Sequence, residues 1–211
     1  MTDSGLWSDR LVVDRLDEIA DRDPTAPAVV DNNSMTGAST RLSYAELQAC
    51  SIRIACALCE LGVEPGDVVA VQLPNWWHYA AIYSACVRIG AVINPLMPIF
   101  RERELEFMLG LAEARILIVP QTFRGFDYLP MANGLKEKLP SLKQVLVVGG
   151  ADPNTAFESA VLERPWETEV DHLALFQSRR PDANDVTEIM YTSGTTGEPK
   201  GVMHTSNTLL C

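Results

Sequence analysis

The sequence predicts an α/β fold, with a mostly parallel sheet and helices on both faces. Short apolar runs, which are typical of buried strands, alternate with longer segments whose apolar residues recur at helical spacing. This order repeats along the chain, and glycine or proline lies near many of the expected boundaries. Because two parallel strands are joined by a crossover helix, the alternation favours βαβ units on one sheet.

The N-terminal part of the chain should contain two helices separated by a short strand. Residues 9–22 have leucine and isoleucine at helical spacing, with a proline beyond their end. Residues 28–30 are expected to form a strand, and 32–40 a polar loop. The second helix should begin at a capping box formed by Ser43 and Glu46, and a glycine at position 62 should end it.

The middle of the chain carries the repeating pattern. We expect strands at 68–71, 91–93, 115–119 and 143–148, and helices at 76–89, 101–113 and about 126–138. Residues 149–186 are less regular, because acidic residues, glycines and prolines interrupt the periodicity. Short helices are expected there, near 155–162 and 170–178.

Composition limits the classes of function. The chain has 211 residues, 47% of them hydrophobic, which is enough for a sizeable core. Its net charge of −11 disfavours a general nucleic-acid or anionic-membrane surface. The sequence contains no apolar run long enough to span a bilayer, and no signal peptide is recognisable, so we expect a cytoplasmic protein. An oligomer is compatible with the sequence.

Five cysteines occur without a secretory context, including Cys56 and Cys59 in a C-x-x-C arrangement. That spacing can indicate zinc or redox chemistry, but here it falls inside an expected helix and has no second ligand pair. We therefore interpret these cysteines as small apolar packing residues in a reducing compartment.

The most informative stretch is Tyr191-Thr-Ser-Gly-Thr-Thr-Gly-Glu-Pro-Lys-Gly201. It lies between a short strand expected at 189–191 and another at 202–203. Gly194, Gly197 and Gly201 allow positive φ and close approach to a ligand, and successive N–H groups in such a turn can bind an anion. Hydroxyl groups and one ammonium group add further donors: Thr192, Ser193, Thr195, Thr196 and Lys200. These features predict a phosphate-binding loop.

This loop is not a Walker A sequence. Walker A has four residues between its glycines and then Gly-Lys-Ser/Thr, whereas two residues separate Gly194 from Gly197 here and Lys200 is followed by glycine. A mononucleotide-binding loop of the Ras or ATPase kind is therefore disfavoured. An ordinary connection rich in serine, threonine and glycine is the simplest alternative.

YTSGTTGEPKGV resembles the signature loop of the adenylate-forming enzymes, the acyl-CoA synthetase or AMP-binding family. The resemblance continues upstream through LSYAEL (42–47), GVEPGDVVAVQLPN (62–75) and GAVINPLMPIFRERELEFML (90–109). It implies that the loop grips the β- and γ-phosphates of ATP, with Lys200 as the catalytic cation. The binding residues it implies are Thr192, Ser193, Gly194, Thr195, Thr196, Gly197 and Lys200. Ser206 departs from the histidine found there in many relatives.

The resemblance also implies the chemistry. A carboxylic acid attacks ATP to give an acyl-adenylate and pyrophosphate, and a thiol, usually that of CoA, then displaces AMP. Magnesium is expected on the phosphates, although no carboxylate can be assigned to it. Residues 123–128 weakly resemble cyclohexanecarboxylate–CoA and medium-chain acyl-CoA ligases, which would connect the protein with fatty acid metabolism. The acid itself is not specified.

The family motifs that follow this loop do not occur in the chain. We therefore expect residues 1–211 to be an incomplete N-terminal domain that is inactive alone: a βαβ core at 41–148, a joint at 149–186, and a strand, loop, strand and helix start at 187–211. An acid–CoA ligase is the preferred parent. The alternatives are an aryl-acid adenylating enzyme that loads a carrier protein, and a non-catalytic nucleotide-binding or structural fragment.

Three further features suggest packing more than chemistry. The aromatic run at 76–79, with His78, is expected to pack the start of a helix. Arg101 and its neighbours to residue 104 have mixed charges typical of a solvated first helical turn. His204 is close to the loop in sequence, but nothing in the sequence indicates a partner that would orient it, so we interpret it as structural.

Overall fold

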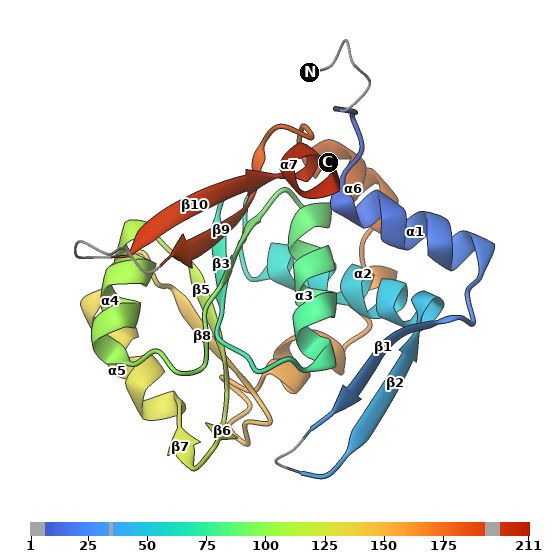
Figure 1. The fold of residues 1–211 in the computed structure, drawn as a ribbon. Helices are drawn as coiled ribbons and strands as arrows, with labels where there is room; N and C mark the ends of the chain where they lie inside the picture. Colours follow the sequence, from blue (N-terminus) through green and yellow to red (C-terminus); the bar gives the residue numbers. More distant parts are fainter. Residues whose placement is uncertain (1–6, 34–35, 193–198) are drawn as a thin grey trace.

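A six-stranded sheet forms the centre of the computed structural model, which describes residues 7–33, 36–192 and 199–211. The strand order is β10-β9-β4-β3-β5-β8 (Figure 1). Four adjacent strands are parallel, and the β9–β10 pair is antiparallel. The six strands are β3 (Val68–Val71), β4 (Val92–Pro95), β5 (Ile116–Pro120), β8 (Gln144–Val148), β9 (Val186–Thr192) and β10 (Lys200–Thr205).

Helices cover both faces of this sheet, as the sequence predicts (Figure 1). One face packs against α1 (Val12–Arg22), α2 (Tyr44–Glu60) and α3 (Trp77–Arg88). The other packs against α4 (Glu102–Leu111) and α5 (Leu129–Lys138). Side chains alternate between the faces, so that Val69 joins the first core and Val68 the second. Burial on both faces explains why these strands are continuous apolar runs.

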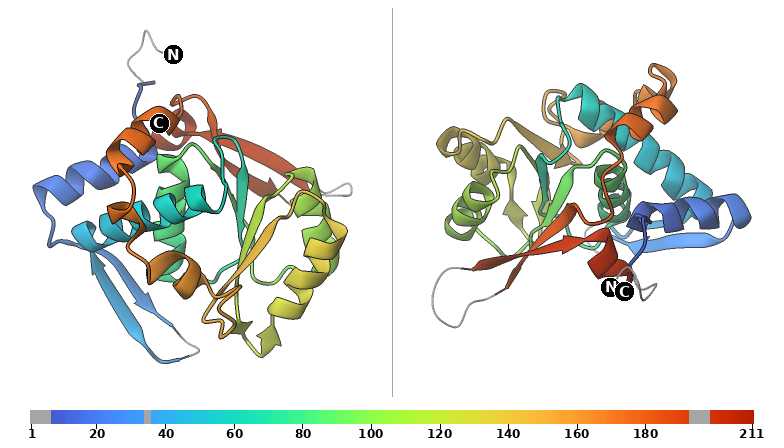
Figure 2. Two further views of the ribbon diagram at one scale, coloured as in Figure 1. Left: turned by 180° about the vertical axis from the view of Figure 1, so that it is seen from behind. Right: turned by 90° about the horizontal axis from the view of Figure 1, so that it is seen from above.

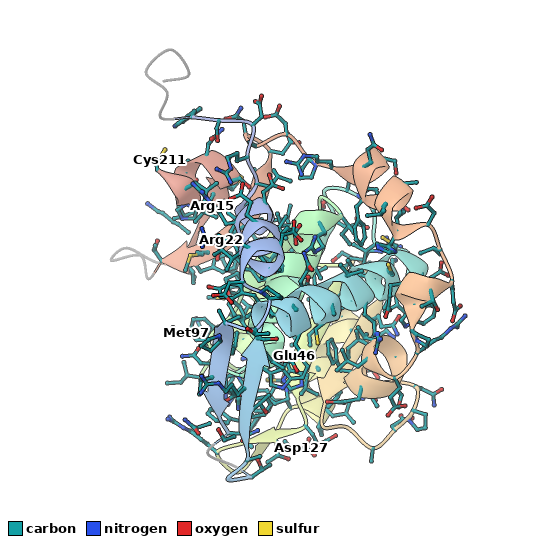
Figure 3. The ribbon with its side chains drawn as sticks, turned by 90° about the vertical axis from the view of Figure 1, so that its right-hand side faces the viewer. Arg15, Arg22, Glu46, Met97, Asp127 and Cys211 are labelled. Atoms are coloured by element: carbon teal, nitrogen blue, oxygen red, sulfur yellow. The ribbon has the colours of Figure 1, made fainter. Side chains whose placement is uncertain are left out.

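The predicted capping box at the start of α2 is confirmed. The N–H of Glu46 donates to Ser43 Oγ at 3.3 Å, and the N–H of Ser43 donates to Glu46 Oε2 at 2.8 Å. Figure 3 shows Glu46 where a preceding strand meets this helix. That strand, β2 (Ser39–Ser43), pairs antiparallel with β1 (Pro27–Asn32), so the expected polar loop at 32–40 is too long. The sequence did not predict β2 because most of its residues are polar and do not form an apolar run.

The last crossover helix also differs from prediction. A small hairpin, β6 (Thr122–Phe123) and β7 (Phe126–Asp127), occupies the residues just before it, so α5 begins at Leu129 and not near 126. Arg124 and Gly125 form the turn, both with positive φ. The Tyr128 hydroxyl donates to the Pro98 carbonyl at 2.8 Å and fastens this hairpin to the loop after β4.

Residues 149–186 form short helical segments, the first two of which pack against α2. These are a π-helix at Glu158–Leu162, a 3₁₀ turn at Trp166–Thr168 and α6 (His172–Arg179). Arg53 of α2 holds the first two, donating to Glu167 Oε1 at 2.6 Å and to the Leu162 carbonyl at 3.0 Å. The guanidinium of Arg179 donates to the Val63 carbonyl at 2.7 Å. Interactions distant in sequence therefore fix this irregular segment.

The two cysteines most enclosed by the core are Cys56 and Cys86. Burial raises the pKa of the Cys56 thiol to about 11 and that of the Cys86 thiol to about 12. Both therefore stay protonated near neutral pH, which suits packing and not thiolate chemistry. None of the helices in the described ranges is both long and apolar enough to cross a membrane.

A candidate nucleotide-binding hairpin

The β9–β10 hairpin places two of the predicted site residues side by side. Six residue pairs join its strands, and the pair at the open end is Thr192 with Lys200. Both side chains are exposed. The other predicted ligands, Ser193, Gly194, Thr195, Thr196 and Gly197, lie outside the described residues. The structure thus brings together the two predicted ligands that it describes.

The two faces of the hairpin have different environments. Successive strand residues point to opposite faces, so Tyr191 and Ile189 pack against the core under α4. The other face carries Thr192 and Lys200, then Met190 and Val202, which are 44% and 38% exposed. In β9 the face bearing the candidate phosphate ligands is therefore the accessible one, and the opposite face packs against the core. The edge strand β10 is exposed on both faces from Lys200 to Met203, and Met203, opposite Ile189, is 66% exposed.

Lys200 is available to bind an anion. Among the described residues, none places a carboxylate within ion-pair distance of its ammonium group, although the chain carries a net charge of −11. An exposed ammonium group beside an exposed threonine hydroxyl offers several hydrogen-bond donors to phosphate oxygens. No cluster of three His, Cys, Asp or Glu suited to a metal occurs in the described ranges.

Gly201 has a different role from the one expected. It lies in β10 opposite Tyr191, and its φ is not positive. A Cβ there would meet the Tyr191 ring at 3.6 Å and Ile189 Cγ2 at 3.4 Å, which are ordinary contacts. Neither backbone conformation nor crowding by these neighbours requires glycine at this position.

A buried carboxyl group lies at the root of the accessible face. Glu188 is opposite His204, and the Tyr83 hydroxyl donates to its Oε2 over a long 3.4 Å. Burial raises the pKa of Glu188, while the hydrogen bond from Tyr83 and the nearby His204 oppose that rise. Thr208 Oγ1 lies 3.5 Å from Nδ1 of His204. Sequence reasoning missed Glu188, for which the available signal was a charged residue inside an apolar strand.

The far end of the hairpin is fastened by Asn207. Its Oδ1 accepts from the N–H of Ser8 at 2.9 Å, and its Nδ2 donates to Asn184 Oδ1 at 2.9 Å. Its own N–H donates to the Ala183 carbonyl at 3.1 Å. Ser206, where many relatives were expected to have histidine, is buried beside it and accepts a weak hydrogen bond from Val12 N–H. Both residues join β10 to the first helix and to the turn before β9.

The aromatic run at 76–79 packs as predicted. The His78 ring stacks on Trp77 with centroids 4.0 Å apart and meets the edge of Phe157. Burial lowers the pKa of His78 to about 4, so the imidazole is neutral near pH 7. This environment suits a core residue and not a proton-transfer group at neutral pH.

Arg101 is not the solvated residue that the sequence predicts. Its guanidinium lies 4.1 Å from the centre of the Phe126 ring and donates to the carbonyls of Pro98 and Phe100 at 2.7 and 2.8 Å. Stacking of this kind is characteristic of arginine. The prediction is wrong at Arg101 because the β6–β7 hairpin covers the start of α4, whereas Glu102, Arg103 and Glu104 are exposed as expected.

Two hollows differ in their suitability for an anionic substrate. One of about 650 Å³ lies between α4 and α5, where Glu102 and Glu106 both pair with Lys138. Another of about 340 Å³ lies between the ends of β3 and β4 and the diverging β9, and Tyr191 lines it. Ligands of open α/β sheets bind outside the carboxyl ends of parallel strands. The second hollow has that position, and Met190 and Tyr191, the two residues before Thr192, line it.

The fold is that of the N-terminal part of adenylate-forming enzymes. The apo structure of Mycobacterium smegmatis MbtA superposes with a TM-score of 0.81 at 30% identity, over 98% of this chain and 36% of that one. The anthranilate CoA ligase AuaEII, solved with anthranoyl-AMP, gives 0.78 at 22% identity, over 98% and 37%, and shows likeness of fold.

The sequence relationship gives the family. Residues 16–211 match the AMP-binding enzyme family, and the chain belongs to it. It is 34% identical to the medium-chain fatty-acid–CoA ligase of Escherichia coli K12, covering 98% of this chain and 35% of that protein. It is also 34% identical to the salicyl-AMP ligase / salicyl-S-ArCP synthetase of Mycobacterium tuberculosis, covering 96% and 34%. The chain spans about a third of the length of these relatives.

Proposed function

We propose that this chain is the phosphate-binding part of an enzyme that joins a carboxylic acid to CoA at the expense of ATP. The observation that carries the proposal is the pairing of Thr192 and Lys200 at the open end of the β9–β10 hairpin, on its accessible face. These residues belong to the loop that resembles the family signature. Ser193, Gly194, Thr195, Thr196 and Gly197 are proposed as further ligands from that resemblance alone.

In the proposed reaction, a carboxylate oxygen attacks the α-phosphorus of ATP. The bond from that phosphorus to the bridging oxygen breaks, and pyrophosphate leaves with the bonding electrons. The thiol of CoA then attacks the acyl carbon, loses its proton, and expels AMP. Lys200 and the Thr192 hydroxyl hold the departing phosphates and stabilise the charge that accumulates there. Magnesium would neutralise further phosphate charge when bound.

The acyl acceptor separates this proposal from a second candidate. The relatives include both a fatty-acid–CoA ligase and an enzyme whose name gives a salicyl-S-ArCP product, and the M. smegmatis MbtA structure has a TM-score of 0.81. An aryl-acid adenylating enzyme that loads a carrier protein is therefore the specific alternative. The two candidate enzymes share the ATP step. They differ in the thiol that accepts the acyl group and in the acid.

The test uses the intact protein that contains these residues. Exchange of labelled pyrophosphate into ATP would be measured over aliphatic, alicyclic and aromatic acids, and AMP release would then be followed with CoA or with a carrier protein. Acid-dependent exchange followed by consumption of CoA supports the proposal. Exchange with transfer only to the carrier favours the second candidate, and absence of exchange with every acid contradicts both.

We also propose that residues 1–211 alone catalyse no adenylation. Among the described residues, the proposed ligands account for the phosphates but not for adenosine or the acid, and rate gains from proximity require both reactants to be held. The same exchange assay on the purified chain should give the no-enzyme rate. An exchange rate above the no-enzyme rate, lost in Lys200→Ala, would refute the proposal. A non-catalytic nucleotide-binding role predicts that the intact protein, too, exchanges pyrophosphate only at the no-enzyme rate.

A further inference from the structure

The β9–β10 hairpin is paired with the parallel strands over a very short length. β3 and β4 share four residue pairs, whereas β4 and β9 share one, Ile93 with Glu188. Figure 2 shows the hairpin projecting from the rest of the molecule. Main-chain pairing with β4 therefore does not fix the direction of the strand between Glu188 and Thr192. Other contacts must determine where the open end stands.

Pro95 accounts for the end of the main-chain pairing between β4 and β9. In a parallel ladder, the bond after the Ile93–Glu188 pair would run from the N–H of residue 95 to the carbonyl of Ile189. Proline has no N–H, so that bond cannot form. The side chain of Asn94 replaces it, because Nδ2 donates to the Ile189 carbonyl at 2.7 Å. β9 is thus held to β4 by a side-chain amide at the point where the backbone ladder stops.

Asn94 is completely buried, which is unusual for asparagine. Its Oδ1 has no hydrogen-bond partner within the described ranges. An apolar residue would avoid this unsatisfied acceptor, which is unfavourable in a core. Among the described residues, the bond to Ile189 is the only polar contact of this side chain, so the attachment of β9 best explains why asparagine is buried here.

Tyr191 supplies a second anchor immediately before Thr192. Its hydroxyl donates to the Met108 carbonyl near the end of α4 at 2.5 Å, and its ring packs in the core on that side of the sheet. Burial raises the pKa of Tyr191 to about 12, so the hydroxyl keeps its proton over the physiological range. The two anchors act on adjacent parts of β9 and on the face opposite the candidate phosphate ligands.

We propose that Asn94 and Tyr191 are positioning residues, which set the place of Thr192 and Lys200 relative to the parallel sheet. Neither side chain is assigned a contact with the nucleotide. They act through the hairpin, and the consequence for ATP rests on the function proposed above. Since Tyr191→Phe removes one hydroxyl and keeps the buried ring, it is a less disruptive test than replacement of Asn94.

The first experiment tests the anchoring without any ligand. Amide hydrogen exchange would be measured in the purified chain with Tyr191→Phe and with Tyr128→Phe as a matched control. Tyr128 also donates a hydrogen bond from its hydroxyl to a carbonyl, that of Pro98, but it lies outside the β9–β10 hairpin. We expect the amides of residues 189–192 and 200–203 to exchange about 3- to 10-fold faster in Tyr191→Phe only. Unchanged exchange, or equal acceleration in the control, would overturn the anchoring role.

The second experiment tests its consequence in the intact enzyme. In Tyr191→Phe we expect the KM for ATP to rise about 3- to 10-fold while the KM for the acid is unchanged, and Tyr128→Phe should alter neither. A merely structural defect would lower kcat through loss of active protein and leave the KM for ATP at its wild-type value, which would overturn the positioning role. If the wild-type protein shows no ATP-dependent reaction, the proposed function fails, while hydrogen exchange still decides the anchoring.

Discussion

The parallel strands and the β9–β10 hairpin are held in place in different ways. β3, β4, β5 and β8 pair with one another over three to five residues each and are covered by helices on both faces. The hairpin pairs with β4 in the ladder at one residue pair, and it carries exposed side chains on both faces, among them Met190, Val202 and Met203. Side-chain anchors hold it instead.

This difference separates stability from function. Continuous backbone pairing and two buried faces make the parallel strands costly to disturb. The hairpin buries less apolar surface and depends on a few polar bonds, so its substitution should affect ligand binding more than folding.

The largest expected effect lies in the parallel core. Leu117, in the middle of β5, is completely buried, so Leu117→Ala should lower the free energy of unfolding by about 2–5 kcal/mol. Met190 on the hairpin is 44% exposed, and Met190→Ala should change it by no more than about 0.5 kcal/mol. Denaturant unfolding of the purified chain measures both. Equal losses would mean that the hairpin belongs to the same cooperative core.

The next effect is a dependence of stability on pH. The pKa of His78 falls from an ordinary 6.5 to about 4 in the folded chain because the ring is buried. As pH falls below about 6.5, the unfolded chain binds the proton first, so stability decreases until about pH 4 and then levels off. The loss from this group is about 3 kcal/mol, and His78→Phe should remove it.

Unfolding of wild-type and variant chains at several pH values checks this expectation. His172→Phe is the control, since the His172 ring lies in a separate segment, where it is hydrogen-bonded to the Glu167 carbonyl. An equal pH dependence in wild type and His78→Phe would show that His78 does not carry the effect. Because His78 lies on α3, outside the hairpin, the result tests the core and not the candidate site.

The parallel strands could be predicted from the sequence because strands buried on both faces consist of short apolar runs. Sequence reasoning missed β2 and the β6–β7 hairpin because small antiparallel pairs are polar and short. Thr192 and Lys200 were predicted as phosphate ligands from a local motif, and the structure pairs them at the open end of the hairpin. The partners of Asn94, Tyr191 and Glu188 could not be predicted, since their bonds join residues 83 to 105 positions apart. The pattern of apolar residues carries no information about such partners.

At the candidate site, Lys200→Ala should slow adenylation by the intact protein by about 10²-fold or more, as for other groups that stabilise developing charge. The free energy of unfolding should not change, because the side chain is exposed and no described carboxylate pairs with it. Pyrophosphate exchange and denaturant unfolding measure the two quantities. Lys136→Ala, an exposed lysine of α5, is the matched control. Unchanged pyrophosphate release in Lys200→Ala would remove its proposed role.

A small effect on folding is also expected at Gly201, and it contrasts with Gly90, a half-buried glycine just after α3. At Gly90, φ is +71° and a Cβ would lie 2.9 Å from the Arg179 carbonyl oxygen, so Gly90→Ala should lower the unfolding free energy by about 1–3 kcal/mol. At Gly201 a Cβ meets only ordinary contacts, and alanine suits a strand better than glycine. Gly201→Ala should therefore leave the unfolding free energy unchanged or raise it by about 0.5–1 kcal/mol. If this variant of the intact protein folds normally but exchanges pyrophosphate more slowly, then the absence of a Cβ at Gly201 in the wild type allows the nucleotide to approach. If it loses stability as Gly90→Ala does, the hairpin is packed more tightly than its exposed face indicates, and the contrast between the two regions is wrong at this strand.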